Sequence, residues 1–216
     1  MLRSRWLALA LFVSLAFGAA RADALSLSLL REEAGQGDWV HVLLDDSEHF
    51  VRTHEFDAIL EGIAGISYCI DLQKEVRLGD PVAYTEVDLG ALLGGAAAAW
   101  LLEHHRVDRD APDAHALVTA LQLSLWEVVY DEEWDFGAGR FQVLGSKGGG
   151  LERALALLGS VPPEIGLGDA GVVALRSPNY QDQIFIPNVP EPGTAILIGL
   201  GVAALAARRS THESAS

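Results

Sequence analysis

A single cysteine and one glutamine are the residues whose types and spacing point to covalent chemistry. Cys69 is the only cysteine in the 216-residue chain, and an aromatic residue precedes it in the stretch Tyr68-Cys69-Ile70. Gln122 interrupts an apolar helical pattern, and Trp126 follows it by one turn on the same helix face. A cysteine thiolate is a nucleophile. An unpaired cysteine in an exported protein is open to oxidation, so we expect Cys69 to be buried or chemically occupied.

The two stretches resemble the two signature motifs of the thioester domains of bacterial surface adhesins. In that family an aromatic-Cys-apolar motif is followed by Gln-x-x-x-Trp, as at Tyr68–Ile70 and Gln122–Trp126 here. The resemblance implies an internal thioester between the Cys69 sulfur and the Gln122 side-chain carbonyl, with Tyr68 and Trp126 supporting it. It also implies that an amine or hydroxyl of a target attacks the bond. Ser124 departs from the family, which usually has alanine there.

A thioester of this kind makes three demands on the fold. Sulfur and amide carbonyl must be held at near-attack distance, because an amide is a poor electrophile. Hydrogen-bond donors should face the developing oxyanion, and the product must be kept dry. A cysteine on a buried strand facing a glutamine on a packed helix meets these demands. The residues expected to form the dry wall are Tyr68, Ile70, Leu121, Leu125, Trp126 and Val129.

Hydrophobic periodicity predicts the elements that position this pair. Ile63–Leu72 is expected to be the strand that carries Cys69. Two helices are expected at Leu89–His105 and at Asp110–Tyr130, the second with a cap residue at Asp110 and Pro112 in its first turn. Other strands are expected at 25–31, 39–44, 82–87, 141–144, 172–175 and 183–187, and a short helix at 151–158. The prediction is an α+β fold over residues 23–187, a mostly antiparallel β core with an inserted helical pair.

The first 22 residues have the pattern of a signal peptide. Arg3 and Arg5 precede the apolar run Trp6–Phe17, which is short for a membrane span. Ala20 and Ala22 are the small residues that predict cleavage by signal peptidase before residue 23. We therefore expect the chain to be exported across the inner membrane.

The end of the chain carries a second targeting pattern over residues 188–216. A Pro-Glu-Pro motif, an apolar segment and a basic pair follow one another (Pro190, Glu191, Pro192; 193–207; Arg208, Arg209). This order resembles the PEP-CTERM sorting signal of Gram-negative bacteria. The resemblance implies recognition by an exosortase, a transient single transmembrane helix in the inner membrane, and then a place at the cell surface or in the extracellular matrix.

Composition and the other polar clusters exclude several classes of function. A formal net charge of −15 argues against nucleic acid as a partner. A group of His and Asp side chains does not have metal-ligand spacing, because adjacent histidines point to different sides of a helix. These residues are His104, His105, Asp108, Asp110 and His115. We expect no metal and no cofactor.

The sequence therefore predicts an exported surface or matrix protein that attaches covalently to amines or hydroxyls on a surface or matrix polymer or protein, in adhesion or biofilm formation. It would react once and would not be an enzyme. One alternative is a structural matrix protein with the same fold and no reactive bond. A less favoured one is a secreted Cys–His hydrolase, since no helix N-terminus or glycine elbow activates Cys69.

Overall fold

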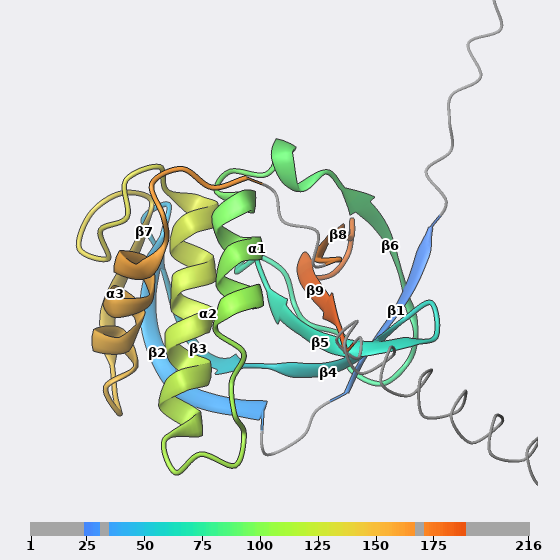
Figure 1. The fold of residues 1–216 in the computed structure, drawn as a ribbon, viewed down its shortest axis with the longest axis horizontal. Coiled ribbons are helices and arrows are strands. Elements are labelled where there is room, and N and C mark those ends of the chain that lie inside the picture. The colour runs from blue at the N-terminus through green and yellow to red at the C-terminus, as the bar shows by residue number, and fades with distance from the viewer. Residues whose placement is uncertain (1–23, 31–34, 167–170, 189–216) are drawn as a thin grey trace, which may run out of the picture.

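The strands of this protein divide into a closed barrel and a separate three-stranded sheet, and the helices cover the sheet (Figure 1). The computed structural model describes residues 24–30, 35–166 and 171–188. The expected signal peptide and sorting tail, including the expected transmembrane helix, lie outside these residues. Within them, none of the helices has the length and apolar character needed to cross a membrane.

Six strands close the barrel in the order β1-β4-β5-β9-β8-β6, and every neighbouring pair is antiparallel. The strands are β1 Leu25–Leu30, β4 Phe56–Leu60, β5 Ile63–Cys69, β6 Val82–Val87, β8 Val173–Arg176 and β9 Gln183–Pro187. The β4–β5 hairpin turns through Glu61 and Gly62, both with positive φ. Such a two-residue turn matches the right-handed twist of the strands that it joins.

The second layer holds the sheet β3-β2-β7, also antiparallel, and the helices. Its strands are β2 Gln36–Leu44, β3 Ser47–His54 and β7 Phe141–Ser146, and its helices are η2 Leu89–Ala91, α1 Gly95–His104, α2 Ala114–Tyr130 and α3 Gly150–Ser160. The α1 and α2 helices are inserted between barrel strand β6 and sheet strand β7. The expectation of a mostly antiparallel β core with an inserted helical pair is therefore confirmed, whereas its division into a barrel and a sheet was not foreseen.

Helix α2 is the centre of the second layer. It is apolar on nearly all sides, as expected of a helix surrounded by protein, and it packs against α1, α3, β2, β3 and β7. Gly94 lets α1 approach it, because a Cβ there would lie 1.9 Å from the Val128 carbonyl oxygen, and its φ is +58°. The predicted helix Leu89–His105 is therefore wrong at its start: η2 is a single turn, and α1 begins after Gly94.

The other predicted helix also begins later than expected. It starts at Ala114, with Asp113 as its N-cap residue. Asp110 instead lies in a turn, where its backbone N–H donates to Asp108 Oδ1 at 3.0 Å. A side chain that captures a nearby backbone N–H in this way competes with helix formation. Residues 50–60, for which the sequence analysis names no element, form the end of β3 and all of β4, with Glu55 between the two strands.

Strands β5 and β9 form a wall shared by two hydrophobic cores. Successive side chains of a strand point to opposite faces, so Tyr68 and Ile184 belong to the core under the helices, whereas Cys69 and Phe185 belong to the barrel interior. All residues from Gly65 to Cys69 are buried. This double burial fixes the register of β5, because a slip of one residue would exchange the two faces.

One ionisable side chain lies inside the helical layer. Glu127 of α2 is fully buried. Burial raises the pKa of its carboxyl to about 7, the backbone N–H of Asp135 opposes the shift, and the carboxylates of Asp131 and Asp135 add to it. Ionised Glu127 therefore destabilises the folded state.

Glu127→Gln should stabilise the protein at alkaline pH. The folded-state pKa of Glu127 lies above the ordinary value of 4.5, so the free energy of unfolding falls as pH rises between these two values and then levels off. The variant should be more stable than wild type by on the order of 1–2 kcal/mol at pH 8, with the gain absent at pH 4. Chemical denaturation at both pH values checks this, with exposed Glu132→Gln as the control. An equal gain at both pH values would contradict it.

Candidate functional site

Cys69 ends strand β5, with its side chain inside the barrel. Cys69 forms no disulfide, and 6% of its surface is exposed. Directly opposite it in the antiparallel register lies Gln183 of β9. The Gln183 side-chain amide donates from Nε2 to the Cys69 sulfur at 3.3 Å. The sulfur is therefore largely buried, with a neutral donor beside it.

Gln122 approaches Cys69 from the helical layer. It lies in the middle of α2, 1% exposed, and its Nε2 donates to the backbone carbonyl oxygen of Cys69 at 2.8 Å. The structure thus brings together the two residues that are 53 positions apart in sequence. This hydrogen bond reaches the backbone of Cys69, whereas the Cys69 sulfur lies on the barrel side of the strand.

A pocket of about 350 Å³ opens between the two layers and is lined by both Cys69 and Gln122. Phe56 and Gln181 line it on the barrel side, and Trp126 of α2 lines it on the side of the helical layer. Trp126 is 3% exposed, and its indole Nε1–H has no acceptor among the described residues. A buried donor without a partner requires an explanation, and Trp126 is also one of the residues that line the pocket.

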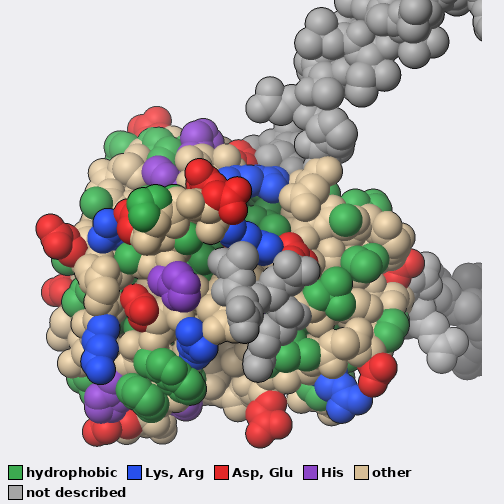
Figure 2. Space-filling model, turned by 90° about the horizontal axis from the view of Figure 1, so that it is seen from below, with side chains coloured by type: hydrophobic (Ala, Val, Ile, Leu, Met, Phe, Trp, Pro, Cys, Tyr) green, Lys and Arg blue, Asp and Glu red, His purple; other side chains and the backbone are tan. Residues whose placement is uncertain are grey.

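The mouth of the pocket carries an exposed aromatic pair. Trp39 of β2 lines the pocket and is 50% exposed. Its ring stacks on Phe50 of β3, with centroids 5.1 Å apart and ring planes 8° apart. Figure 2 views the molecule from below Figure 1 and shows hydrophobic side chains beside histidine and basic side chains on that face. The pocket therefore reaches solvent past Trp39.

The environment of the sulfur favours the protonated thiol. Burial raises the pKa of the Cys69 thiol to about 12, the Gln183 hydrogen bond opposes the shift, and the Asp71 carboxylate adds to it. At neutral pH the thiolate is therefore rare, which protects the side chain from oxidation. Chemistry at this sulfur requires groups that stabilise negative charge as it develops.

Tyr68 lies on the opposite face of β5 and does not line this pocket. Its hydroxyl donates to Glu55 Oε2 at 2.6 Å, and Arg109 Nε donates to Glu55 Oε1 at 2.6 Å. Arg109 also pairs with Asp57 at the start of β4. Burial, with the Glu55 charge, raises the pKa of Tyr68 well above its usual range. Tyr68 thus anchors β5 to the β3–β4 junction and supports Cys69 from behind.

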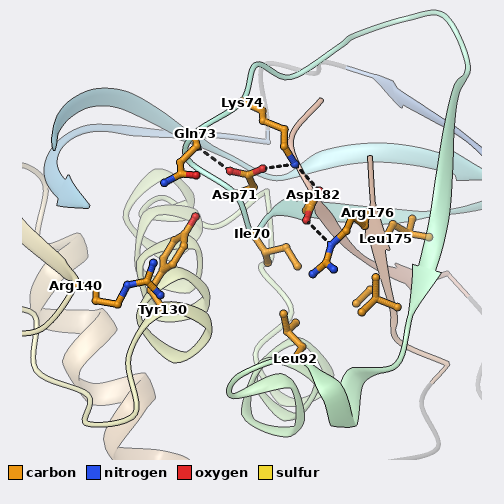
Figure 3. A pocket seen from close by; sticks show the side chains of 12 residues that line it. Ile70, Asp71, Gln73, Lys74, Leu92, Tyr130, Arg140, Leu175, Arg176 and Asp182 are labelled. Carbon is orange, nitrogen blue, oxygen red and sulfur yellow. Dashed lines mark hydrogen bonds and ion pairs between the residues drawn. The ribbon is translucent and has the colours of Figure 1, made fainter. Parts of the chain in front are cut away.

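An ion-pair cluster fixes the chain just beyond Cys69 and just before Gln183 (Figure 3). Lys74 Nζ lies 2.8 Å from Asp71 and 3.1 Å from Asp182, and Arg176 also pairs with Asp182. The backbone N–H of Ile70 donates to the Asp182 carbonyl oxygen at 2.9 Å. Because the cluster bridges both strand ends, it holds Cys69 and Gln183 in register.

The remaining predicted residues have structural positions. Ser124, the departure from the adhesin motif, donates to the carbonyl oxygens of Ala120 and Ala154, so its hydroxyl faces α3. Of the six residues predicted to wall the thioester, Trp126 lines the pocket, and the others belong to the core of the helical layer. That core shields the pocket from behind.

Two histidines of the group excluded as a metal site, His104 and His105, both pack against Trp100. The His104 ring stacks on Trp100, and His105 Nε2 contacts Ser160 Oγ at 3.1 Å. Among the residues that the structure describes, no three His, Cys, Asp or Glu side chains gather as metal ligands would.

Sequence reasoning missed three residues of the site. Gln183 was placed on a closing strand without a role, and Ser67, which donates to Gln183 Oε1 at 3.0 Å, was not singled out. His54 lines the pocket, with its ring 4.4 Å from that of Phe56. The alternation of β5 places Ser67 and Cys69 on one face, but strand order, which no local pattern encodes, brings Gln183 to them.

Comparison with known proteins identifies the targeting tail. Residues 188–210 match the PEP-CTERM protein-sorting motif. The chain is a carrier of the PEP-CTERM sorting signal. This marks it as an exported protein processed by an exosortase, with membrane-anchored processing before its extracellular or surface location. Neither the curated proteins nor the solved structures include a match to the chain.

Tyr68→Phe should lower stability while leaving the Cys69 site in place. It removes a donor from buried Glu55, and an under-satisfied buried group costs about 1–3 kcal/mol. Thermal unfolding should show the loss, and the amount of thiol that reacts before unfolding should equal that of wild type. A large rise in Cys69 accessibility would contradict the separation of the two faces of β5. Tyr180→Phe provides a matched control for loss of a tyrosine hydroxyl.

Proposed function

We propose that this exported protein carries an internal thioester between Cys69 and Gln122 and uses it to attach covalently to a surface or matrix polymer or protein. The bond transfers the Gln122 acyl group to an amine or hydroxyl of the target. The observation that carries the proposal is a 2.8 Å hydrogen bond from the Gln122 side-chain amide to the Cys69 backbone carbonyl oxygen, which brings the only cysteine and Gln122 together in the lining of one pocket. Adhesion or biofilm formation is the biological setting that we infer.

Formation of the bond needs only the chain itself. The Cys69 sulfur attacks the side-chain carbonyl carbon of Gln122, an S–C bond forms, the C–N bond breaks, and the thiol proton leaves with ammonia. Sequestration supports this reaction, because a held pair gains the advantage of proximity and a dry site slows hydrolysis. The Trp126 indole N–H, buried beside the pocket without an acceptor, would donate to the acyl oxygen as negative charge develops on it.

The same pocket gives a target access to the bond. An amine or hydroxyl enters past Trp39, attacks the acyl carbon, and forms an amide or ester as the S–C bond breaks. The sulfur takes the electron pair and the proton, so Cys69 returns to a thiol. The reaction happens once per molecule, since the acyl group of Gln122 is consumed. Export and sorting by the tail bring the domain to such targets.

Intact mass tests the bond directly. The full-length chain, purified with detergent in buffers free of amines, should be lighter than its sequence by one ammonia beyond any processing of its ends. Methylamine should then add one methylamine, because it opens the thioester. Peptide mapping should place the methylamide on Gln122 and release one alkylatable thiol at Cys69.

Variants separate the bond from other causes of lost mass. Cys69→Ala and Gln122→Ala should each abolish the deficit and the methylamine adduct, whereas Gln73→Ala, an exposed glutamine near the ion-pair cluster, should retain both. A full mass in the wild-type protein, with a thiol that labels after unfolding, would remove the covalent function. The structural matrix protein would then be the better account.

Trp126→Phe tests the role assigned to the indole. The substitution keeps an aromatic side chain in the wall and removes the N–H. We expect the methylamine reaction to slow by about tenfold or more, since loss of one oxyanion donor has effects of that size or larger. Trp100→Phe, in α1, should react at the wild-type rate. Equal rates for the two variants would contradict the assignment.

His54 provides the test of the hydrolase alternative, because it lines the same pocket as Cys69. A Cys–His nucleophile needs a lowered thiol pKa, whereas burial raises that of Cys69 to about 12. His54→Ala should therefore leave the ammonia deficit in place. Repeated turnover of an ester such as p-nitrophenyl acetate, lost in both His54→Ala and Cys69→Ala, would instead support the hydrolase.

A further inference from the structure

The Cys69 sulfur has one side-chain hydrogen-bond donor in the described part of the chain, and that donor is Gln183. We propose that Gln183, oriented by Ser67, stabilises the negative charge that develops on the Cys69 sulfur when the thioester forms and when a target displaces it. This inference rests on the proposed thioester for its chemistry. It adds a residue that neither signature motif contains.

The geometry places the amide nitrogen at the reacting atom. Gln183 Nε2 lies 3.3 Å from the sulfur, and Gln183 is fully buried. Its backbone is paired with that of Cys69 across the β5–β9 ladder. The donor is therefore fixed by two strands of the barrel rather than by a loop, which is the preorganisation that electrostatic stabilisation requires.

Ser67 and the Gln181 carbonyl together orient the Gln183 amide, so that its NH2 end faces the sulfur. Ser67 Oγ lies 3.0 Å from Gln183 Oε1 and 3.1 Å from the Ile184 carbonyl oxygen. A hydroxyl that donates to Oε1 holds the carbonyl end, so the NH2 end points to Cys69. Gln183 Nε2 also lies 3.4 Å from the Gln181 carbonyl oxygen, which again only a donor can satisfy.

The two glutamines contact different atoms of Cys69, because Gln183 Nε2 donates to the sulfur and Gln122 Nε2 donates to the backbone carbonyl oxygen. Gln183 presents nitrogen to the sulfur, and its carbonyl is occupied by Ser67, so it is positioned to donate. Gln122 approaches from the opposite layer, and its acyl group is the one that the sulfur attacks in the proposed function. The assignment predicts that Gln183 remains an unmodified amide after reaction with methylamine.

The need for such a donor follows from the burial of the thiol. Burial raises the thiol pKa to about 12, and the Gln183 hydrogen bond acts against that shift. When a target displaces the sulfur, the S–C electron pair passes to sulfur in a site that excludes water. A hydrogen bond to an ionised group is stronger than one to a neutral group, so the Gln183 contribution grows as the bond breaks.

Gln183→Leu removes the donor with little change of volume. Ser67 keeps the Ile184 carbonyl as an acceptor, so no new unpaired hydroxyl results. In the full-length protein we expect aminolysis by methylamine to slow by about tenfold at each pH between 7 and 9. Ser67→Ala should slow it less, because the Gln183 amide stays but loses its orientation. Gln73→Leu, which changes an exposed glutamine outside this pocket, is the matched control and should react as wild type.

A thiol measurement tests the same donor without the thioester. In Gln122→Ala the sulfur is a free thiol, and its rate of reaction with methyl methanethiolsulfonate follows the thiolate fraction. Adding Gln183→Leu should lower that rate by about threefold, because a tenfold loss of thiolate is partly offset by its higher nucleophilicity. Thermal unfolding confirms that each variant is folded.

The outcomes distinguish the two proposals. If the wild-type protein shows no ammonia deficit but the thiol rate falls with Gln183→Leu, the thioester fails and the sulfur donor stands. If Gln183→Leu matches Gln73→Leu in both measurements, the inference about Gln183 is overturned whether or not the thioester forms. A methylamide mapped to Gln183 would also overturn it, because Gln183 would then be the acyl donor.

Discussion

The pairing of β5 with β9 is the constraint on which the rest of this structure depends. These strands are buried on both faces and separate the barrel interior from the core under the helices. Because each face must match a different core, their register is fixed. That register places Gln183 opposite Cys69 and turns the Cys69 backbone carbonyl toward Gln122. A cysteine with donors from two layers is a consequence of this shared wall.

Buried polar groups tie the wall to its surroundings. Tyr68 reaches Glu55 and, through it, Arg109 on one side, whereas Lys74 bridges the two strand ends on the other. A buried charge is tolerated only when it is paired and hydrogen-bonded. These networks lie next to Cys69 in sequence but point away from its sulfur. They hold the backbone of the site, whereas the hydrogen bond at the sulfur comes from Gln183.

Export and the proposed chemistry both require that the thiol of Cys69 be protected. A free thiol outside the cytoplasm is exposed to oxidation, and both burial and acylation protect it. In the proposed function, the pocket between the layers holds the acyl bond, and the side of the pocket at Trp39 is the route to a target. In the proposed function, the covalent bond keeps the processed protein at the surface.

The sequence by itself determined the local features. Short-range composition and periodicity, which a single sequence carries, predicted four features. These are the Pro-Glu-Pro tail, the strand around Cys69, the helix face shared by Gln122 and Trp126, and the mostly antiparallel core. The sequence placed the starts of both helices too early, at Leu89 and Asp110. The close packing of Gly94 on Val128 and the capture of the Asp110 N–H by Asp108 decide where these helices begin. Only the tertiary structure decided that the barrel closes and that Gln183, held by Ser67, meets the Cys69 sulfur. It also decided that Tyr68 faces the other core and that His54 lines the pocket. These contacts join residues up to 116 positions apart, and their partners are selected by strand order and by the packing of two cores, which no periodicity along the chain encodes.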